Sequence, residues 1–351
     1  MLTLRELNRA TLARQHLLRR HQGGVAAVVH RLAGLQAQEP RPPYLGLWTR
    51  LDGFARDDLH AALRARTLVR ATMMRATLHL VTAADFAEFR PLLQPLLAAA
   101  ARRFPEVDFA AVAVAAERLL AEGPHTFNEL RPRLEREFPG AYDRALGYAV
   151  RMTVPLIMVP TEDRWSFPRD SAFALPGIEL AAEPDIGTLV ERYLAAFGPA
   201  TAADMQTWSG LSGFKAVLNG MRDRLEVLVD ERGRELFDLP EAPRPEGDAP
   251  APVRFLPDFD NLMLGHADRS RVLAEEHRGE VVTKNLRVRA TYLVDGFVAG
   301  TWQIRRTGKK AKLLLTPFTP VPTEALEEEA MALLAFAEPD AEARSLEVMG
   351  S

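Results

Sequence analysis

The chain has 351 residues, a formal net charge of −3 and no cysteine, and hydrophobic residues make up 47% of it. This size and apolar content predict two or three globular domains and exclude a disordered chain, and the lack of cysteine excludes disulfides and thiol chemistry. The N-terminus is charged throughout, and no segment reaches the ~18 apolar residues of a membrane span. We therefore expect a cytoplasmic protein without a signal peptide or a membrane partner.

Positive charge is concentrated at the start of the chain. Residues 1–80 contain thirteen arginines and five acids, whereas residues 321–351 contain eight acids and one arginine. A near-neutral total therefore conceals a basic region that can attract a polyanion locally. Arginine outnumbers lysine by 39 to 5. High-GC coding alone produces such a bias, so the rarer lysines are the more informative cations.

Helical periodicity and short strands alternate in residues 1–103, which predict a winged-helix-like unit followed by a linking helix. The expected elements are helices at 4–20, 24–35, 56–65 and 83–103 and paired strands over 67–81. The segment LQAQEP at 35–40 interrupts the helical pattern. Prolines at 40, 42 and 43 prevent a preceding helix from continuing through it.

The middle of the chain contains one pattern twice, in residues 104–182 and 183–240. Each copy has a helix, a Gly-Pro break, two further helices and a strand pair. The predicted elements are helices at 113–122, 125–138 and 141–152 with strands at 155–160 and 164–168, then helices at 186–197, 200–210 and 212–225 with strands at 226–230 and 234–240. Three helices and a hairpin are the order of a winged helix. The predicted fold class is therefore α+β with tandem winged-helix units.

A Pro- and acid-rich linker at 240–252 precedes a C-terminal domain at 253–351, which is predicted to be rich in β structure. Its predicted β stretches include VRFLPDFDNLMLG at 253–265 and VVTKN at 281–285. Asp295-Gly296 and Thr307-Gly308 predict tight turns between later strands. A helix at 323–336 is expected to come last.

Gln36 and Gln38 flank one small residue in the non-helical segment. In an extended backbone, positions i and i+2 face the same side, so we expect both amides to meet at one solvent-accessible cleft. Each amide offers an acceptor oxygen and two donor hydrogens without a charge, so the pair can orient a water and stabilise a developing cation. The alternative is that both amides only bond to nearby backbone groups.

Three segments in order resemble the AlkZ-type winged-helix DNA glycosylases. They are RLAGLQAQEPRPPYLGLWTRL at 31–51, RATLHLVTAADF at 75–86 and FLPDFDNLMLGHADR at 255–269. A glutamine–aliphatic–glutamine motif is the catalytic signature of that family, so the resemblance implies that Gln36 and Gln38 are catalytic. It also implies a monomeric, monofunctional enzyme that acts on alkylated purines in double-stranded DNA and associates with the nucleoid when bound.

The implied chemistry suits neutral side chains. A purine alkylated at N7 or N3 is cationic and leaves as a neutral base, so no strong general acid is needed, while the sugar becomes oxocarbenium-like. Oriented amide dipoles stabilise such a cation without reorganising. Glu39 either assists, or is a solvated side chain or an ion-pair partner of Arg41. Bulky adducts and interstrand crosslinks are further candidate substrates.

The segment TWQIRRTGKKAKLLL at 301–315 is expected to form a hairpin with five cations and no acid around its tip. These cations are Arg305, Arg306, Lys309, Lys310 and Lys312. Such a tip can grip phosphates or enter a minor groove, and the resemblance implies DNA contact. The alternative is that the charges only protect a sheet edge from pairing.

Other site candidates have a structural explanation beside the functional one. They are His79, Asp258, Asp260, Asp268 and Arg269. His79 follows a strand pattern that favours a structural role, and the remaining four suit turns and ion pairs as well as a site. No His or Cys spacing indicates a metal, and no P-loop, GxGxxG or GxSxG motif is present, so we expect neither metal nor cofactor.

A non-catalytic winged-helix DNA-binding or regulatory protein is the alternative interpretation of the same modules. The glutamine pair distinguishes the two, since a regulator does not need two amides on one face beside a DNA channel. A dimer would favour the regulator, because operator readers commonly use two-fold symmetry.

Overall fold

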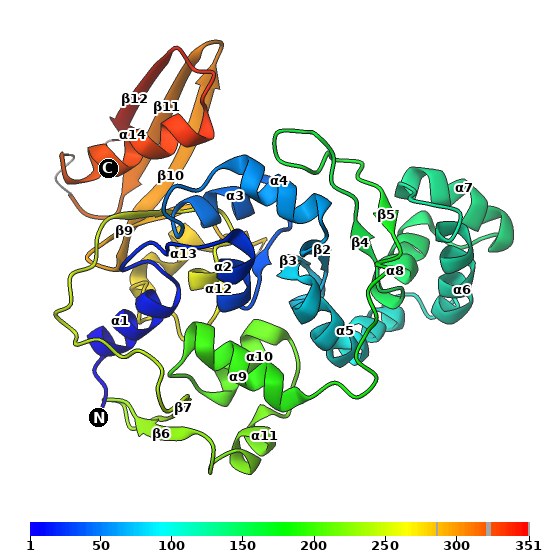
Figure 1. Cartoon of the computed structure of the whole chain (residues 1–351), viewed down its shortest axis with the longest axis horizontal. Helices are drawn as coiled ribbons and strands as arrows, with labels where there is room; N and C mark the ends of the chain where they lie inside the picture. Colours follow the sequence, from blue (N-terminus) through cyan, green and yellow to red (C-terminus); the bar gives the residue numbers. More distant parts are fainter. Residues whose placement is uncertain (286, 321–323, 350–351) are drawn as a thin grey trace.

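Short helices surround a small antiparallel sheet in the N-terminal region (Figure 1). The structure is a computed structural model that describes residues 1–285, 287–320 and 324–349. The elements of this region are α1 (Leu4–Arg14), α2 (Val25–Arg31), β1 (Leu35–Gln36), α3 (Arg41–Trp48), α4 (Arg56–Arg64), β2 (Leu68–Thr72), a 3-10 turn (Met74–Ala76), β3 (Leu78–Thr82), α5 (Ala83–Ala98) and a second 3-10 turn (Ala99–Arg103).

Two helices of this region differ from the sequence prediction. Helix α1 begins with a capping box between Thr3 and Glu6 but ends at Arg14, and His16 then adopts a φ of 55°. Helix α3 was not predicted. Its prolines at 42 and 43 lie in the first turn, where a helix does not use the backbone N–H that proline lacks. The prolines therefore begin a helix as well as keeping the glutamine segment non-helical.

The second region has the predicted order of three helices and a hairpin. Its elements are α6 (Phe109–Leu120), α7 (Phe127–Glu137), α8 (Asp143–Thr153), β4 (Ile157–Met158) and β5 (Phe173–Ala174). The return strand was predicted at 164–168, but in the structure it is β5, which lies several residues later. Trp165 and Phe167 instead leave the hairpin and pack against the core of the N-terminal region, where Trp165 meets Tyr44 edge to face at 5.2 Å.

The β4–β5 hairpin extends the sheet of the N-terminal region. Ala71 in β2 pairs with Ile157 in β4, which gives the strand order β1-β3-β2-β4-β5. The second region nevertheless has its own apolar core between α6, α7 and α8. The division into units at 1–103, 104–182, 183–240 and 253–351 stays a prediction.

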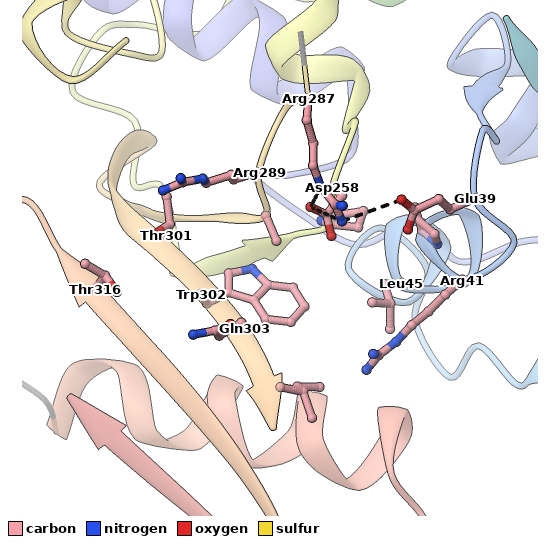
Figure 2. A pocket seen from close by; sticks show the side chains of 14 residues that line it. Glu39, Arg41, Leu45, Asp258, Arg287, Arg289, Thr301, Trp302, Gln303 and Thr316 are labelled. Carbon is pink, nitrogen blue, oxygen red and sulfur yellow. Dashed lines mark hydrogen bonds and ion pairs between the residues drawn. The ribbon is translucent and has the colours of Figure 1, made fainter. Parts of the chain in front are cut away.

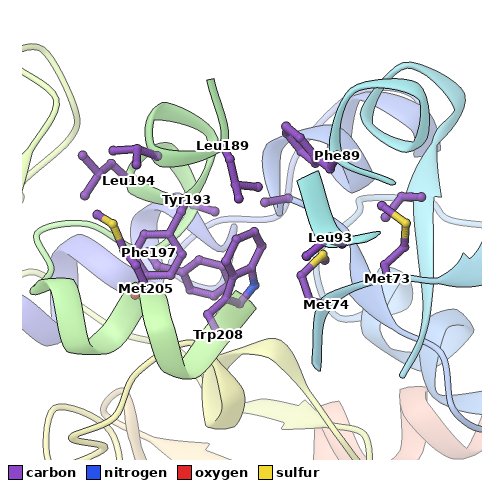
Figure 3. Packing of buried hydrophobic residues seen from close by; sticks show 14 of the residues in the cluster. Met73, Met74, Phe89, Leu93, Leu189, Tyr193, Leu194, Phe197, Met205 and Trp208 are labelled. Atoms are coloured by element: carbon purple, nitrogen blue, oxygen red, sulfur yellow. The ribbon is translucent and has the colours of Figure 1, made fainter. Parts of the chain in front are cut away.

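The third region repeats the order of three helices and a hairpin, as predicted. Its elements are α9 (Ile186–Phe197), α10 (Ala202–Ser209), α11 (Phe214–Gly220), β6 (Glu226–Val229) and β7 (Glu235–Asp238). Tyr193, Phe197 and Trp208 from α9 and α10 form one apolar cluster with residues of α5 such as Phe89 and Leu93 (Figure 3). This shared core joins the third region to the N-terminal region.

The C-terminal region contains a five-stranded sheet of order β12-β11-β10-β9-β8. Its elements are β8 (Arg254–Leu256), α12 (Asn261–Leu264), a 3-10 turn (Glu275–His277), α13 (Arg278–Val281), β9 (Thr291–Val294), β10 (Phe297–Thr307), β11 (Lys310–Pro317), α14 (Glu324–Ala337) and β12 (Ala343–Val348). In Figure 1 this sheet and helices α6–α8 lie on opposite sides of the N-terminal region.

Three predictions for the C-terminal region need correction. VVTKN is not a strand, because Val281 ends α13 and Val282 forms only an isolated bridge with Val288. NLML in the first β stretch is helix α12. The helix predicted at 323–336 is α14, and residue 323 lies outside the described residues. It is not the last element as predicted, because strand β12 follows it and pairs in parallel with β11.

The turn of the β10–β11 hairpin lies one residue later than predicted. Thr307 pairs with Lys310, so the two loop residues are Gly308 and Lys309, and Gly308 has a φ of +56°. That backbone conformation favours glycine. The Asp295-Gly296 turn between β9 and β10 is as predicted. Within the described residues, no helix is long and apolar enough to cross a membrane.

Candidate active site around the glutamine pair

The glutamine segment is fixed by its backbone. In the β1–β3 pair Gln36 lies opposite His79, and Ala37 N–H donates to Leu78 O at 2.7 Å before the chain bends away. Arg70 is buried and donates from Nε to Ala37 O at 2.9 Å and from Nη2 to Gln38 O at 3.2 Å. The backbone of the motif is therefore held by a strand pairing on one side and by a guanidinium on the other.

The amide of Gln36 is turned inward. The residue is 8% exposed, and its Oε1 accepts a hydrogen bond of 2.7 Å from Nη2 of Arg75. The same Nη2 lies 3.3 Å from Nε2 of His79. Burial, together with the charge of Arg75, lowers the pKa of His79 to about 3, so its imidazole is neutral at physiological pH. His79 is thus a buried partner of the motif.

Gln38 is exposed and lines a cleft between the N-terminal and second regions. Its Oε1 accepts a hydrogen bond of 3.2 Å from the backbone N–H of Leu78 in β3. The side chain therefore bonds to β3 at the point where the backbone of β1 no longer does. The cleft has a volume of about 630 Å³. Its wall includes Arg144, Gly147, Arg151 and Met152 of helix α8.

The two amides are not equally open, contrary to the expectation of one shared cleft. Gln38 lines the 630 Å³ cleft, and Gln36 is not among its lining residues. Nε2 of Gln36 forms no hydrogen bond to a described residue. This nitrogen atom is not completely enclosed by protein, so it retains some contact with solvent. Gln36 is therefore much more enclosed than Gln38, and its amide nitrogen is not fully buried.

A second cleft of about 660 Å³ lies on the other side of the motif, between α3 and the C-terminal sheet (Figure 2). Glu39 pairs with Arg287 and not with Arg41, contrary to one of the expectations, and lies 3.5 Å from its Nη2, which also lies 3.4 Å from Asp258. Arg41 instead lies 3.5 Å from Glu338. Thr301 and Gln303 of β10 line the opposite wall. Glu39 borders both clefts, so the segment from Gln38 to Pro40 forms a ridge between them.

Of the other acidic candidates, Asp260 and Asp268 have structural partners. Asp260 is buried, accepts two hydrogen bonds of 2.8 Å from Arg50, and caps α12. Asp268 accepts from Arg232 at 3.0 Å and from Arg234 at 2.7 Å. Burial opposes ionisation of Asp268, but hydrogen bonds from Ser270 and Arg234 outweigh it and lower the pKa to about 2. Neither carboxylate lines either cleft.

Arg269 is half-buried, and burial lowers its pKa, with repulsion from Arg278 adding to the effect. Its Nε is enclosed and has no partner among the described residues. It also lies close enough to Arg75 for its charge to lower the pKa of that residue. Arg269 therefore belongs to the surroundings of Arg75, on the inner side of the glutamine segment.

The hairpin cations are largely compensated, which corrects the expectation of a tip without acids. Arg306 pairs with Glu338 at 2.8 Å, Lys312 pairs with Glu347 at 2.8 Å, and Lys309 pairs with Glu342. Arg305 and Lys310 form no ion pair with a described residue and are exposed. The strand register places them on one face together with Lys312, because Arg305 lies opposite Lys312.

Sequence reasoning missed Arg70 and Arg75, the two arginines that contact the motif. Each interrupts an otherwise apolar or small stretch, TLVRAT and TMMRAT, and a charge inside such a stretch is the signal that marks a largely enclosed, hydrogen-bonded group. Within the part of the chain that the structure describes, no cluster of three or more His, Asp or Glu side chains is arranged to hold a metal.

Comparisons with known proteins give a fold, a relative and a family. The fold is similar to that of the solved Streptomyces sahachiroi DNA glycosylase AlkZ, with a TM-score of 0.81, 23% identity, and coverage of 99% of this chain and 100% of that one. The chain is also 29% identical over 353 residues to the interstrand DNA cross-link repair glycosylase of Streptomyces sahachiroi, covering 91% of this chain and 92% of the relative. The model of the family described as DNA glycosylase AlkZ-like matches residues 29–336. The chain therefore belongs to the AlkZ-like family of DNA glycosylases.

Proposed function

We propose that this protein hydrolyses the N-glycosidic bond of cationic purines alkylated at N7 or N3 in double-stranded DNA. The observation that carries the proposal is the exposed amide of Gln38 on a 630 Å³ cleft, in a chain of this family. The relative is named for interstrand cross-link repair, and bulky adducts and crosslinks are included among the proposed substrates.

The proposed mechanism uses dipoles rather than a charged base. Gln38 faces the substrate, and the amide nitrogen of Gln36 acts beside it in holding water near the anomeric carbon. Because a cationic purine leaves as a neutral base, the enzyme needs to stabilise only the oxocarbenium-like sugar and to position water. The product is an abasic site, and the enzyme is monofunctional.

The charge distribution around the cleft suits a DNA backbone. Arg144 and Arg169 line the 630 Å³ cleft, are exposed and form no ion pair with a described residue. Burial lowers the pKa of Arg70 to about 10, so it is still protonated at neutral pH. Phosphates on either side of a lesion would meet these cations, and such contacts dominate non-specific affinity.

We also propose that the two middle regions are winged helices and that the protein acts as a monomer. By position, α8 and α11 are the third helices of these units, and α8 lines the cleft that holds Gln38. The unit that contains α8 is therefore the one proposed to face DNA. Arg222 and Arg224 follow the end of α11 at Gly220 and pair with Glu235 and Glu191, so these two arginines do not support base reading by the third region.

The test is incubation with duplex DNA that carries N7-methylguanine, followed by alkaline cleavage at abasic sites. We expect cleavage at the lesion only after treatment with alkali. A second duplex with an N7-linked interstrand crosslink tests the larger substrate, with release of one strand on a denaturing gel as the readout. Binding to both duplexes without excision would favour the non-catalytic regulator.

A further inference from the structure

One guanidinium connects the catalytic segment, the buried histidine and the third region. Nη2 of Arg75 donates to Gln36 Oε1 at 2.7 Å and lies 3.3 Å from His79 Nε2. Nη1 of Arg75 donates to the backbone carbonyl of Trp208 in α10. Arg75 forms no ion pair with a described carboxylate, so its hydrogen bonds all go to neutral acceptors.

These contacts determine the orientation of the Gln36 amide. A guanidinium only donates hydrogen bonds, so Gln36 has to present its oxygen to Arg75 and its nitrogen on the other side. His79 fits the same scheme. Its Nδ1 lies 3.0 Å from the carbonyl of Thr77 and therefore carries the proton, which leaves Nε2 as an acceptor for Arg75.

The backbone at Arg75 is shaped to deliver this side chain. Arg75 and Ala76 have φ values of 54° and 56°, the left-handed region that non-glycine residues seldom adopt. Helix α10 packs tightly against this turn. A Cβ on Gly210 would lie 3.3 Å from Cα of Arg75 and 3.0 Å from Cδ2 of Leu96. The left-handed turn at Arg75 and Ala76 is therefore packed directly against Gly210 of the third region.

We propose that Arg75 is the positioning residue of the glutamine pair and that it couples the motif to the third region. It holds the Gln36 amide with its oxygen inward and its nitrogen toward the solvent edge, so that the amide N–H groups are already aimed to donate a hydrogen bond to the oxygen of the attacking water, while stabilisation of the positive charge on the sugar is left to Gln38. His79 does not contact the Gln36 amide in this scheme, but its neutral Nε2 accepts a hydrogen bond from Arg75 and so holds the guanidinium in place. This inference rests on the proposed glycosylase function.

A double-mutant cycle tests the proposal in the full-length protein. Arg75→Met keeps the length of the stem but removes the donors, and Gln36→Ala removes the amide. On the N7-methylguanine duplex, each single variant should reduce the single-turnover excision rate by a similar factor. The double variant should be no slower than Gln36→Ala alone, because Arg75 acts through Gln36. DNA affinity should stay within about twofold of the wild type.

Arg254→Met is the matched control. Arg254 is buried, whereas Arg75 is half-buried, and like Arg75 it donates to a backbone carbonyl, that of Leu17 at 3.1 Å, but it forms no hydrogen bond to Gln36 or Gln38. This variant should lower Tm without lowering the excision rate of the folded enzyme. Multiplicative rate losses in the Arg75/Gln36 cycle would overturn the proposal.

A second readout does not depend on activity. In a sample labelled with ¹⁵N-glutamine, the Gln36 side-chain amide signals are assigned by their absence in Gln36→Ala. Arg75→Met should shift and broaden these signals, while Arg254→Met should leave them in place. Unchanged Gln36 signals in Arg75→Met would overturn the proposal. If the wild type excises no alkylated purine, the proposed function fails, but this spectrum still decides whether Arg75 positions the amide.

Discussion

Lys312 and Glu347 form an ion pair of 2.8 Å across the parallel strands β11 and β12. Both side chains are about half exposed, with 51% and 45% of their surface accessible. Exposed pairs of this kind contribute little to stability. A phosphate could therefore replace Glu347 at little energetic cost, so the pairing with Glu347 does not prevent Lys312 from taking part in the proposed DNA contact.

The hairpin prediction separates unpaired from paired cations. The double variant Arg305→Ala with Lys310→Ala should weaken DNA binding for all sequences alike. It should also reduce the slope of log K against log salt by about 0.9 for each phosphate that the protein no longer neutralises. The measurement is a salt titration by fluorescence anisotropy. Glu347→Gln is the opposite control and should raise affinity, because it frees Lys312. If neither variant changes the slope of log K against log salt, the cations do not contact DNA and serve only to protect the sheet edge from pairing.

The elements predicted best are those whose sequence signals are local. Helix α9 was predicted with correct bounds because its apolar pattern ends at Gly198-Pro199, and in the structure Asp185 caps its start. Helix α3 was missed because its prolines were interpreted only as helix breakers. Strand β12 was missed because its side chains are mostly exposed and it is held by parallel pairing with β11, a partner that periodicity does not reveal.

In the candidate site, too, local features could be predicted from the sequence and long-range contacts could not. The position of Gln38 beside a cleft agrees with the expectation from its spacing and the following prolines. Gln36 turns inward to a hydrogen bond from Arg75, and Arg75 in turn contacts Trp208 and lies against Gly210, far along the chain. The compensation of the hairpin by Glu338, Glu342 and Glu347 also comes from residues about 30 positions away in sequence. Long-range partners of this kind leave no periodic signal.

A second prediction concerns Gln38. Gln38→Ala removes an amide from the wall of the cleft without touching the apolar core. We expect the single-turnover excision rate to fall by about 100-fold, as when one preorganised dipole is lost from an active site, with DNA affinity close to that of the wild type. Gln206→Ala, an exposed glutamine in α10, is the control and should keep the full rate. An unchanged rate in Gln38→Ala on every substrate that the wild type cleaves would disprove its catalytic role.

A third prediction treats Asp260 as a structural residue. Asp260 and Arg50 are both almost fully buried and share two hydrogen bonds of 2.8 Å. Asp260→Ala leaves the guanidinium buried without its counter-ion, which costs about 3–5 kcal/mol of unfolding free energy. Urea denaturation measures this loss. Asp258→Ala is the control, since Asp258 is only loosely paired at the edge of a cleft, and it should change stability far less. Equal effects of the two variants would contradict this assignment.

A fourth prediction concerns acid stability. Asp268 has a pKa of about 2 in the folded protein, below its ordinary value. A carboxyl whose pKa is lower in the folded state stabilises the fold above the unfolded pKa of about 3.9 and loses that contribution as the pH falls through the folded value. Asp268→Asn should therefore destabilise the protein at pH 7 and lose less further stability than the wild type between about pH 4 and pH 2. Urea midpoints across this range are the measurement, and parallel curves would refute the argument.

The final prediction concerns the chemical route of excision. Among the described residues, no lysine lines either cleft, and the five lysines of the chain all lie after residue 214. A Schiff-base mechanism requires an amine beside the sugar. Borohydride added during turnover should therefore trap no covalent protein–DNA adduct, while a lysine-dependent glycosylase treated in parallel should be trapped. Excision should also persist in chelator, because the proposed mechanism uses amides alone. A trapped adduct would require an amine nucleophile, and loss of activity in chelator would require a metal. Either result would contradict hydrolysis by the glutamine pair.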